Sequence, residues 1–210
     1  MARRAEAERN DRALLEAARE VIAVDGAHTS VASIAARAGV GIGSLYRRYS
    51  SKTALFQHLV ELALDEWTEI AEQGLADEDP WNGLVHYIST SVRTGSLAPL
   101  AGMVTFTDEM TEKNTRSDKA FEALIDRAHR AGVLRRDVTA VDVLLLVEQL
   151  SKSPLIEHLQ QQGRADMLDA ARNAQRRVVA IAVAGLRPGD QPLPGEEPTM
   201  DLFTQRWSTS

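Results

Sequence analysis

Apolar residues recur with helical spacing along most of this chain of 210 residues. In the first such segment Leu14, Ala18, Val21 and Ile22 lie at positions i, i+4, i+7 and i+8, and therefore on one face of a helix. The pattern predicts a first helix from about Arg9 to Asp25. Because no region is rich in strand patterns, we expect an all-α fold of about nine helices.

A second, short helix is predicted between Ser30 and Gly39. The Ser30 hydroxyl suits an N-cap, because it can accept a hydrogen bond from a backbone N–H group in the first turn. Gly39 ends this helix after about two turns, and so short a helix is stable only when it packs against a neighbour. Four apolar residues share the inward-facing spacing: Val31, Ile34, Ala35 and Ala38.

A third helix is predicted to begin near Gly41 or Ile42 and to end near Tyr49, with Val40, Leu45 and Tyr49 buried. Its outward-facing positions combine apolar, small, hydroxyl-bearing and cationic side chains: Ile42, Gly43, Ser44, Arg47 and Arg48. Arginine can bind guanine bidentately, a hydroxyl can bond to base edges, and an apolar side chain can contact the thymine methyl group. Two short helices around a tight turn are typical of a helix-turn-helix whose second helix enters the DNA major groove, and a solvated surface helix is the alternative.

Lys52 stands in the first turn of a fourth helix, which Ser50 or Ser51 caps and which is predicted to run to about Gln73 before Gly74 ends it. A cation near a helix N-terminus opposes the helix dipole. A DNA phosphate docked on the free N–H groups of that turn would explain Lys52, whereas a tolerated surface lysine is the plainer alternative.

Over about residues 10–60 the chain resembles the TetR/AcrR family of bacterial transcriptional regulators. The motif elements that carry the resemblance follow one another in register: Thr29-Ser30, Ile34-Ala35, Ala38-Gly39-Val40, Gly43-Ser44-Leu45-Tyr46, Tyr49, Lys52 and Leu55-Phe56. The resemblance implies a three-helix DNA-binding domain, joined by a fourth helix to an all-helical ligand-binding body, in a homodimer. It also implies that Tyr46 and Lys52 contact phosphate and that Ser30 and Ser44 contact DNA backbone or base.

The chain departs from the family pattern in the third helix. Gly41 stands where a serine commonly caps that helix, and Arg48 stands where histidine is common. Since arginine stays charged at every working pH, we expect DNA binding to depend less on pH between about pH 6 and 8 than a histidine would make it.

Three domains are expected: a helix-turn-helix domain over residues 1–60, a helical ligand-binding and dimerisation domain over residues 61–187, and a flexible C-terminal tail over residues 188–210. The tail is rich in Pro and Gly and has no helical period. Further helices are expected at about Pro80–Arg93, Ala98–Met110, 117–131, Asp137 or Thr139 to Pro154, and Arg164–Gly185.

A small-molecule pocket is expected among the central helices of the second domain. Its candidate wall is mostly aromatic and aliphatic: Trp81, Leu84, Tyr87, Met103, Phe106, Phe121, Leu124, Ile125, His129 and Leu144. Such side chains adapt to an apolar or amphipathic effector, and a histidine adds a polar anchor. Plain hydrophobic core is the alternative for each residue.

The last two predicted helices are assigned to a homodimer interface, because their apolar surface is broader than one monomer needs. Small residues such as Ala170 and Ala174 alternate there with Val178 and Ile181, which allows close helix packing. The resemblance implies a four-helix bundle at this place, and an ordinary intramolecular core is the alternative. Two heads on one dimer would read a palindromic double-stranded operator.

The net charge of −6 is unevenly distributed along the chain. Residues 1–60 hold nine Lys/Arg against six Asp/Glu, whereas the remainder holds 15 against 24. The basic residues 1–60 would be attracted to DNA phosphate, whereas the acidic remainder of the chain would be repelled by it.

Neither an enzyme nor a membrane protein is indicated. Cysteine is absent, the five histidines lack a metal-binding spacing, and no Gly-rich phosphate loop or nucleophile elbow occurs, so we predict no catalytic residue, metal site or cofactor. No apolar run is long enough for a membrane span, and the first residues lack a secretory apolar core, which favours the cytoplasm. The sequence thus predicts a ligand-responsive repressor, and a helical protein-binding adaptor with an inactive DNA-binding head is the alternative.

Overall fold

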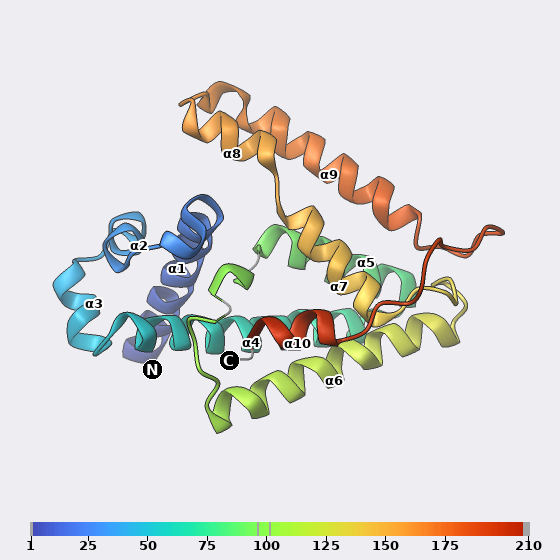
Figure 1. Ribbon diagram of the computed structural model, residues 1–210, viewed down its shortest axis with the longest axis horizontal. Helices are drawn as coiled ribbons and strands as arrows, with labels where there is room; N and C mark the ends of the chain where they lie inside the picture. The colour runs from blue at the N-terminus through green and yellow to red at the C-terminus, as the bar shows by residue number, and fades with distance from the viewer. Residues whose placement is uncertain (1, 96, 101, 208–210) are drawn as a thin grey trace. The chain divides into compact units, whose positions relative to one another are not determined.

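The structure, a computed structural model, describes residues 2–95, 97–100 and 102–207, and every regular element in these ranges is a helix (Figure 1). The all-α fold predicted from the apolar periodicity is therefore confirmed. The chain forms two compact units. The head unit comprises the described residues of Met1–Trp67, Ser96–Arg116 and Phe203–Ser210. The body unit comprises Thr68–Gly95 and Ser117–Leu202.

The head unit begins with three helices, a short 3-10 turn and the first part of a fourth helix: α1 (Ala2–Asp25), η1 (Gly26–His28), α2 (Val31–Ala38), α3 (Ile42–Arg48) and α4 (Lys52–Ala76). The predicted cap of α2 is confirmed, since the Ser30 hydroxyl accepts a 3.0 Å hydrogen bond from the Ser33 N–H group. Gly39 ends α2 with a left-handed φ of 68°, a conformation that glycine adopts without strain. α1 begins at Ala2, well before Arg9, the predicted start of this helix.

One face of each head helix contributes to a shared core. Leu14, Ala18 and Ile22 of α1 are buried in it together with Ile34 and Leu59. Full burial of a large aliphatic side chain contributes about 1.5–3 kcal/mol relative to leaving it in water. Because α2 and α3 are too short to be stable alone, this shared core is what holds them in place.

The prediction of one helix over residues 98–110 is wrong. Among the described residues of this segment, a short 3-10 helix, η2 (Ala98–Leu100), comes first. Gly102 then takes a left-handed φ of 78°, and the next helix, α6 (Asp108–Arg130), starts only at Asp108. α6 starts well before residue 117, the predicted position, because the Thr107 hydroxyl accepts a backbone hydrogen bond in its first turn. Two acidic residues in that turn also complement the helix dipole.

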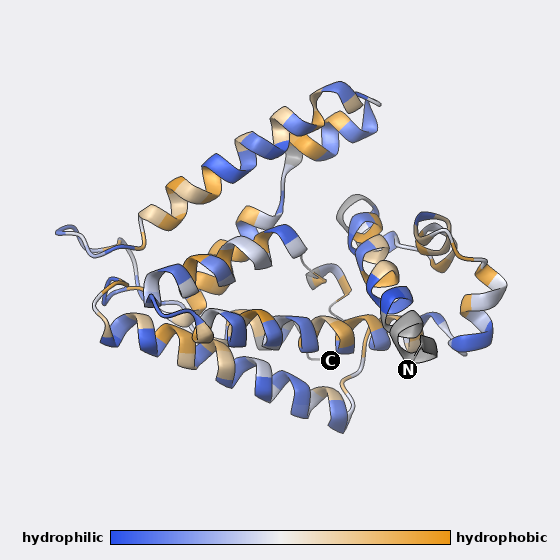
Figure 2. Ribbon diagram, turned by 180° about the vertical axis from the view of Figure 1, so that it is seen from behind, coloured by the Kyte–Doolittle hydropathy of each residue, from blue (hydrophilic) through white to orange (hydrophobic). Residues whose placement is uncertain are grey.

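The body unit contains the ends of α4 and α6 together with four further helices and a 3-10 turn: α5 (Pro80–Thr94), α7 (Ala140–Ser151), α8 (Pro154–Gln161), η3 (Ala165–Met167) and α9 (Leu168–Ala184). Thr139, one of the two predicted starts of α7, caps this helix by accepting from the Asp142 N–H group at 3.1 Å. Figure 2 shows hydrophobic residues along the C-terminal half of α9. None of the helices in the described ranges is both long and apolar enough to cross a membrane.

Gly74 was predicted to end the fourth helix, but α4 continues through it to Ala76. A Cβ atom on Gly74 would lie 2.7 Å from the Gly83 carbonyl oxygen of α5, so the two glycines allow the helix backbones to touch. The Arg127 guanidinium of α6 then binds carbonyl groups at and just beyond the end of α4, at 2.9 Å from Leu75 and 3.1 Å from Glu78. These carbonyls have no partner within the helix, so Arg127 satisfies acceptors that would otherwise need water.

The segment after Leu186, predicted to lack regular structure, contains α10 (Asp201–Trp207). The Arg135 guanidinium donates to the Gln191 carbonyl, and Asp137 accepts from the Leu193 N–H group at 2.9 Å. Arg135 also donates to the Asp137 carboxylate at 2.6 and 2.8 Å, and these hydrogen bonds, followed by the one from the Leu193 N–H group, hold the pKa of Asp137 below its usual value. The flexibility of the remaining tail stays a prediction.

Candidate nucleic-acid interface

The turn between α2 and α3 sets the direction of α3. The Val40 N–H group donates to the Ala35 carbonyl at 3.0 Å and closes the end of α2. Gly41 is the N-cap of α3 and offers no side chain to it, while its carbonyl accepts from the Ser44 N–H group at 2.8 Å. A three-residue connection with Gly on either side of Val40 thus joins two short helices, as a helix-turn-helix requires.

The buried side of α3 is mostly as predicted. Leu45 and Tyr49 are buried in the head core. Val40 was also predicted to be buried, but it is 38% exposed, and that prediction is wrong. Its hydrogen bond to the end of α2 fixes Val40 outside both helices, so its side chain stays at the surface.

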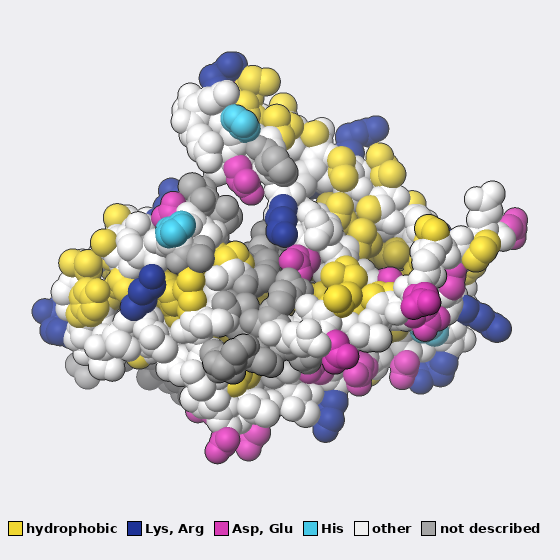
Figure 3. All heavy atoms as spheres, viewed as in Figure 1, with side chains coloured by type: hydrophobic (Ala, Val, Ile, Leu, Met, Phe, Trp, Pro, Cys, Tyr) yellow, Lys and Arg dark blue, Asp and Glu magenta, His cyan; other side chains and the backbone are white. Residues whose placement is uncertain are grey.

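The outer side of α3 exposes apolar and cationic side chains together, as Figure 3 shows at the edge of the head unit (left). Ile42 is 44% exposed and Tyr46 is 53% exposed, which is unusual for such large side chains on a short helix. Gly43 and Ser44, which lie between Ile42 and Tyr46 in the sequence, are also exposed and have small side chains. Arg47 is exposed and forms no ion pair with any residue in the described ranges. We name this surface, made of these five residues, the α3 face.

Arg48 has a different environment from Arg47. Its guanidinium binds the Asp11 carboxylate of α1 with both terminal nitrogens, at 2.6 Å from Oδ1 and 3.0 Å from Oδ2. The same guanidinium lies 5.3 Å from the centre of the Tyr49 ring. The hydrogen bond to Asp11 raises the pKa of Arg48, which is charged in any case. Sequence reasoning missed Asp11, because 37 positions separate the two residues.

The other two predicted DNA contacts lie at helix N-termini. Ser51 caps α4 by accepting from the Ala54 N–H group at 3.0 Å, which resolves the choice between Ser50 and Ser51. Lys52 follows it, exposed, with its ammonium group 5.1 Å from the centre of the Phe56 ring. The Ser30 hydroxyl is already engaged in the cap of α2 and in a 2.8 Å hydrogen bond with the Ser33 hydroxyl.

The ten predicted pocket residues belong to both units. Met103 and Phe106 pack against the core of the head unit, whereas the other candidates belong to the body unit. In the body Tyr87 and Phe121 stack with ring centres 4.7 Å apart. Burial raises the pKa of Tyr87, so this phenol remains neutral.

The remaining pocket candidates of the body differ in exposure. Leu84, Leu124 and Ile125 are buried, and Leu144 is partly buried. Trp81, at the start of α5, faces the Arg187 guanidinium 4.0 Å from its ring centre. His129 forms a 3.2 Å hydrogen bond with the Arg135 carbonyl. We name four buried apolar residues of α5 and α6, of which Tyr87 and Phe121 stack, the body cluster: Leu84, Tyr87, Phe121 and Leu124.

α9 is apolar on two sides. Ala171, Val179 and Val183 are buried in the body unit. Val178 and Ile181 nevertheless point outward and are 54% and 70% exposed. A helix that buries one apolar side and exposes another has more apolar surface than its own unit covers.

A helix-turn-helix that exposes an apolar and cationic second helix, carried by a chain with a separate helical body, defines a DNA-binding transcriptional regulator. Two family descriptions match the chain. "Bacterial regulatory proteins, tetR family" matches residues 14–59, and "Transcriptional regulator SbtR-like, C-terminal domain" matches residues 79–188. The chain belongs to the tetR family, whose members are non-enzymatic DNA-binding transcription factors with a ligand-binding C-terminal domain.

Solved structures of the same family share the fold. A TetR transcription regulatory protein from Mycobacterium vanbaalenii is 26% identical, with a TM-score of 0.56 over 88% of this chain and 99% of that one. The regulator SCO0520 from Streptomyces coelicolor is 22% identical, with a TM-score of 0.55 over 86% and 99% of the two chains. LfrR from Mycobacterium smegmatis, solved in complex with proflavine, is 20% identical, with a TM-score of 0.50 over 80% and 95%. No curated protein matches the chain.

Proposed function

We propose that the protein is a ligand-responsive repressor that binds a palindromic operator as a homodimer and is released by a small apolar or amphipathic effector. The observation that carries the proposal is the α3 face, where Arg47 is exposed without an ion-pair partner in the described ranges beside exposed Ile42 and Tyr46. Arg47 would read a base edge in the major groove, and Ile42 would contact a thymine methyl group. Tyr46 and Lys52 would bind flanking phosphates.

The homodimer would form through α8 and α9. Val178 and Ile181 of α9 and Leu155 of α8 are all more than half exposed, so they offer an apolar surface that a second copy would cover. Ala170 and Ala174 continue the stripe on α9 and allow a partner helix to approach closely. Two copies would then present two α3 faces to successive major grooves, and for that geometry the operator must be a palindrome.

The effector would act through the body cluster and α4. Stacked aromatic rings and buried leucines suit an apolar ligand. α4 contributes residues to both units, so a ligand that shifts it in the body would change the spacing of the two heads. A coupling free energy of about 1–3 kcal/mol is typical for such a change.

Selection from random duplex DNA tests the proposal. The purified protein is incubated with the library at about 150 mM salt, because affinity for DNA depends steeply on ionic strength. Enrichment of a palindrome supports a dimeric operator reader. A folded, helical protein that enriches no sequence contradicts the proposal and favours a protein-binding adaptor.

Distances between spin labels on the two heads test the release mechanism. The distance should change when an effector that releases the operator is added. Release of the operator at an unchanged distance would show that α4 does not transmit the signal in this way.

A further inference from the structure

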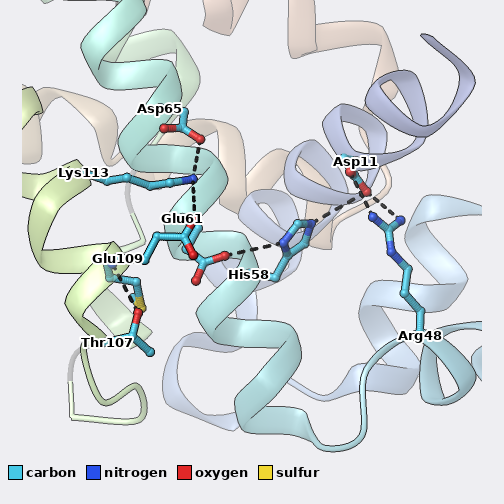
Figure 4. A network of polar contacts seen from close by, with 9 residues as sticks. Asp11, Arg48, His58, Glu61, Asp65, Thr107, Glu109 and Lys113 are labelled. Carbon is cyan, nitrogen blue, oxygen red and sulfur yellow. Dashed lines mark hydrogen bonds and ion pairs between the residues drawn. The ribbon is translucent and has the colours of Figure 1, made fainter. Parts of the chain in front are cut away.

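Charged and titratable side chains from three helices of the head unit meet around Asp11 (Figure 4). Asp11 of α1 lies between Arg48 of α3 and His58 of α4, and Glu61 of α4 lies on the far side of the His58 ring. The His58 Nε2 atom is 3.7 Å from Asp11 Oδ1, and its Nδ1 atom is 3.8 Å from Glu61 Oε2. We name these four residues the Asp11 network.

The pairing with Asp11 occupies the part of Arg48 that would bind DNA. A guanidinium recognises guanine or phosphate with two parallel N–H groups. Both terminal nitrogens of Arg48 already lie against Asp11: Nη2 donates a 3.0 Å hydrogen bond to Oδ2, and Nη1 is in ion-pair contact 2.6 Å from Oδ1. Arg48 therefore reaches DNA with that geometry only by leaving Asp11. The carboxylate left behind would then be largely buried and without its cation, which is unfavourable, all the more so near DNA phosphates.

Among the residue types in the Asp11 network, histidine is the one whose ordinary pKa lies near neutral pH. Histidine gains a proton between about pH 5 and 8, whereas carboxylates stay charged and arginine stays cationic over that range. The groups that face its ring are Asp11 from α1, Glu61 from its own helix, and Tyr49, whose ring centre is 5.3 Å away. Burial raises the pKa of Tyr49 to about 12, so this phenol stays neutral.

We propose that Asp11 competes with DNA for Arg48, and that protonated His58 replaces Arg48 beside Asp11 when the guanidinium turns to the operator. The inference rests on the proposed DNA-binding function and adds a regulatory element to it. In the free protein Arg48 neutralises Asp11, and in the complex His58 does so. His58 therefore binds a proton more tightly in the complex, binding takes up a proton, and operator affinity falls as the pH rises.

The source of this pH dependence differs from the expectation at Arg48 itself. Arg48 itself stays charged at every working pH, so it adds no titrating group to α3. The structure brings a histidine, from α4, to the carboxylate that holds this arginine. The proposed proton-linked group therefore lies on α4, ten positions further along the chain than Arg48.

Operator affinity measured by fluorescence anisotropy from about pH 6 to 8, at fixed ionic strength, tests the inference with the full-length protein. One linked proton should lower the affinity of the wild type about three- to tenfold across this range. His58→Gln should remove the dependence, while His28→Gln, a change at an exposed histidine of the same unit, should leave it intact. Circular dichroism of each variant checks that it is folded.

Two further variants separate competition for Arg48 from a general charge effect. Asp11→Asn should raise the affinity at pH 8 about threefold or more, because Arg48 is no longer retained, and should flatten the pH profile. Glu16→Gln removes the same charge from an exposed position of α1 and should reproduce neither effect. Arg48→Ala should also flatten the profile, because Asp11 then faces only His58 in both states.

The outcomes distinguish this inference from the proposed function. A selected operator bound equally well at pH 6 and pH 8 overturns the Asp11 network as a proton-linked element and leaves the DNA-binding function standing. A pH dependence that survives in His58→Gln or Arg48→Ala also overturns it. Failure to bind any duplex at any pH contradicts the DNA-binding function itself.

Discussion

Two surfaces of this protein expose large apolar side chains, and they differ in what surrounds those side chains. On the α3 face, Ile42 and Tyr46 lie beside Arg47. On α9, Val178 and Ile181 continue a stripe of exposed alanines at intervals of three and four residues. The first surface is short and cationic, whereas the second follows the length of a helix.

The difference indicates two kinds of partner. Cationic, hydroxyl-bearing and apolar groups within about two helical turns suit a DNA major groove, where phosphate, base edges and methyl groups occur together. A long stripe of small and aliphatic residues suits the matching stripe of another helix. Exposed apolar area by itself therefore does not identify a partner, because the neighbouring side chains decide which partner fits.

The largest expected effect comes from placing a charge on the α9 stripe. Ile181→Asp should abolish dimerisation, since an unpaired charge buried in an interface costs about 3–5 kcal/mol. Operator binding should fall with it. Ala180→Asp adds the same charge to the other side of α9, at an exposed position, and should leave the dimer intact. Light scattering measures the mass, and an undisturbed Ile181→Asp dimer would show that the interface lies elsewhere.

A change inside the body that touches neither surface should affect stability alone. Arg127→Met removes the hydrogen bonds to the end of α4 and should lower the free energy of unfolding by about 2–3 kcal/mol. Arg127→Lys keeps the charge but not the planar geometry, so its loss should be smaller. Urea unfolding measures both. If Arg127→Met instead changed the mass of the dimer and left the free energy of unfolding unchanged, the prediction would be contradicted. Arg127 would then act on the dimer interface rather than on the stability of the body.

The two arginines of α3 should differ in their effect on operator binding. Arg47→Ala should weaken specific binding by about 1–3 kcal/mol and relax the preference for one base. Arg48→Ala should have a smaller effect, because Arg48 must first leave Asp11. Titration of single-base operator variants measures both quantities. A larger loss for Arg48→Ala would reverse the assignment of the base-reading residue.

The smallest effect is expected at Lys52. Lys52→Ala should weaken binding to every duplex alike and reduce the slope of log affinity against log salt by about one unit. Lys52→Arg, which keeps the charge, should restore the slope. A loss confined to the selected operator would mean that Lys52 reads sequence rather than phosphate.

Much of the head was predictable because its elements are fixed by close neighbours in the sequence. The cap at Ser30, the left-handed Gly39 and the burial of Leu45 each depend on residues within about one helical turn. The exposure of the α3 face follows from the same short-range spacing. Val40 was mispredicted because a turn residue has no helical period to place it.

The body was less predictable because its interactions join distant positions. Gly74 looks like a helix end in the sequence, yet it allows a close approach to Gly83, nine positions away. Met103 and Phe106 look like pocket residues, yet they complete the core of the head unit. The helix end at Gly74 was mispredicted because residue type alone does not say which helix face will lie opposite.

The sequence by itself determined that the chain is helical, that it carries a helix-turn-helix, and that α3 exposes Arg47. Tertiary structure alone decided that Arg48 is held by Asp11 and that His58 lies beside the same carboxylate. The physical reason is the range of the interactions. Helical periodicity and caps act between residues a few positions apart, whereas an ion pair across helices exists only after the burial of many apolar side chains has fixed how those helices pack.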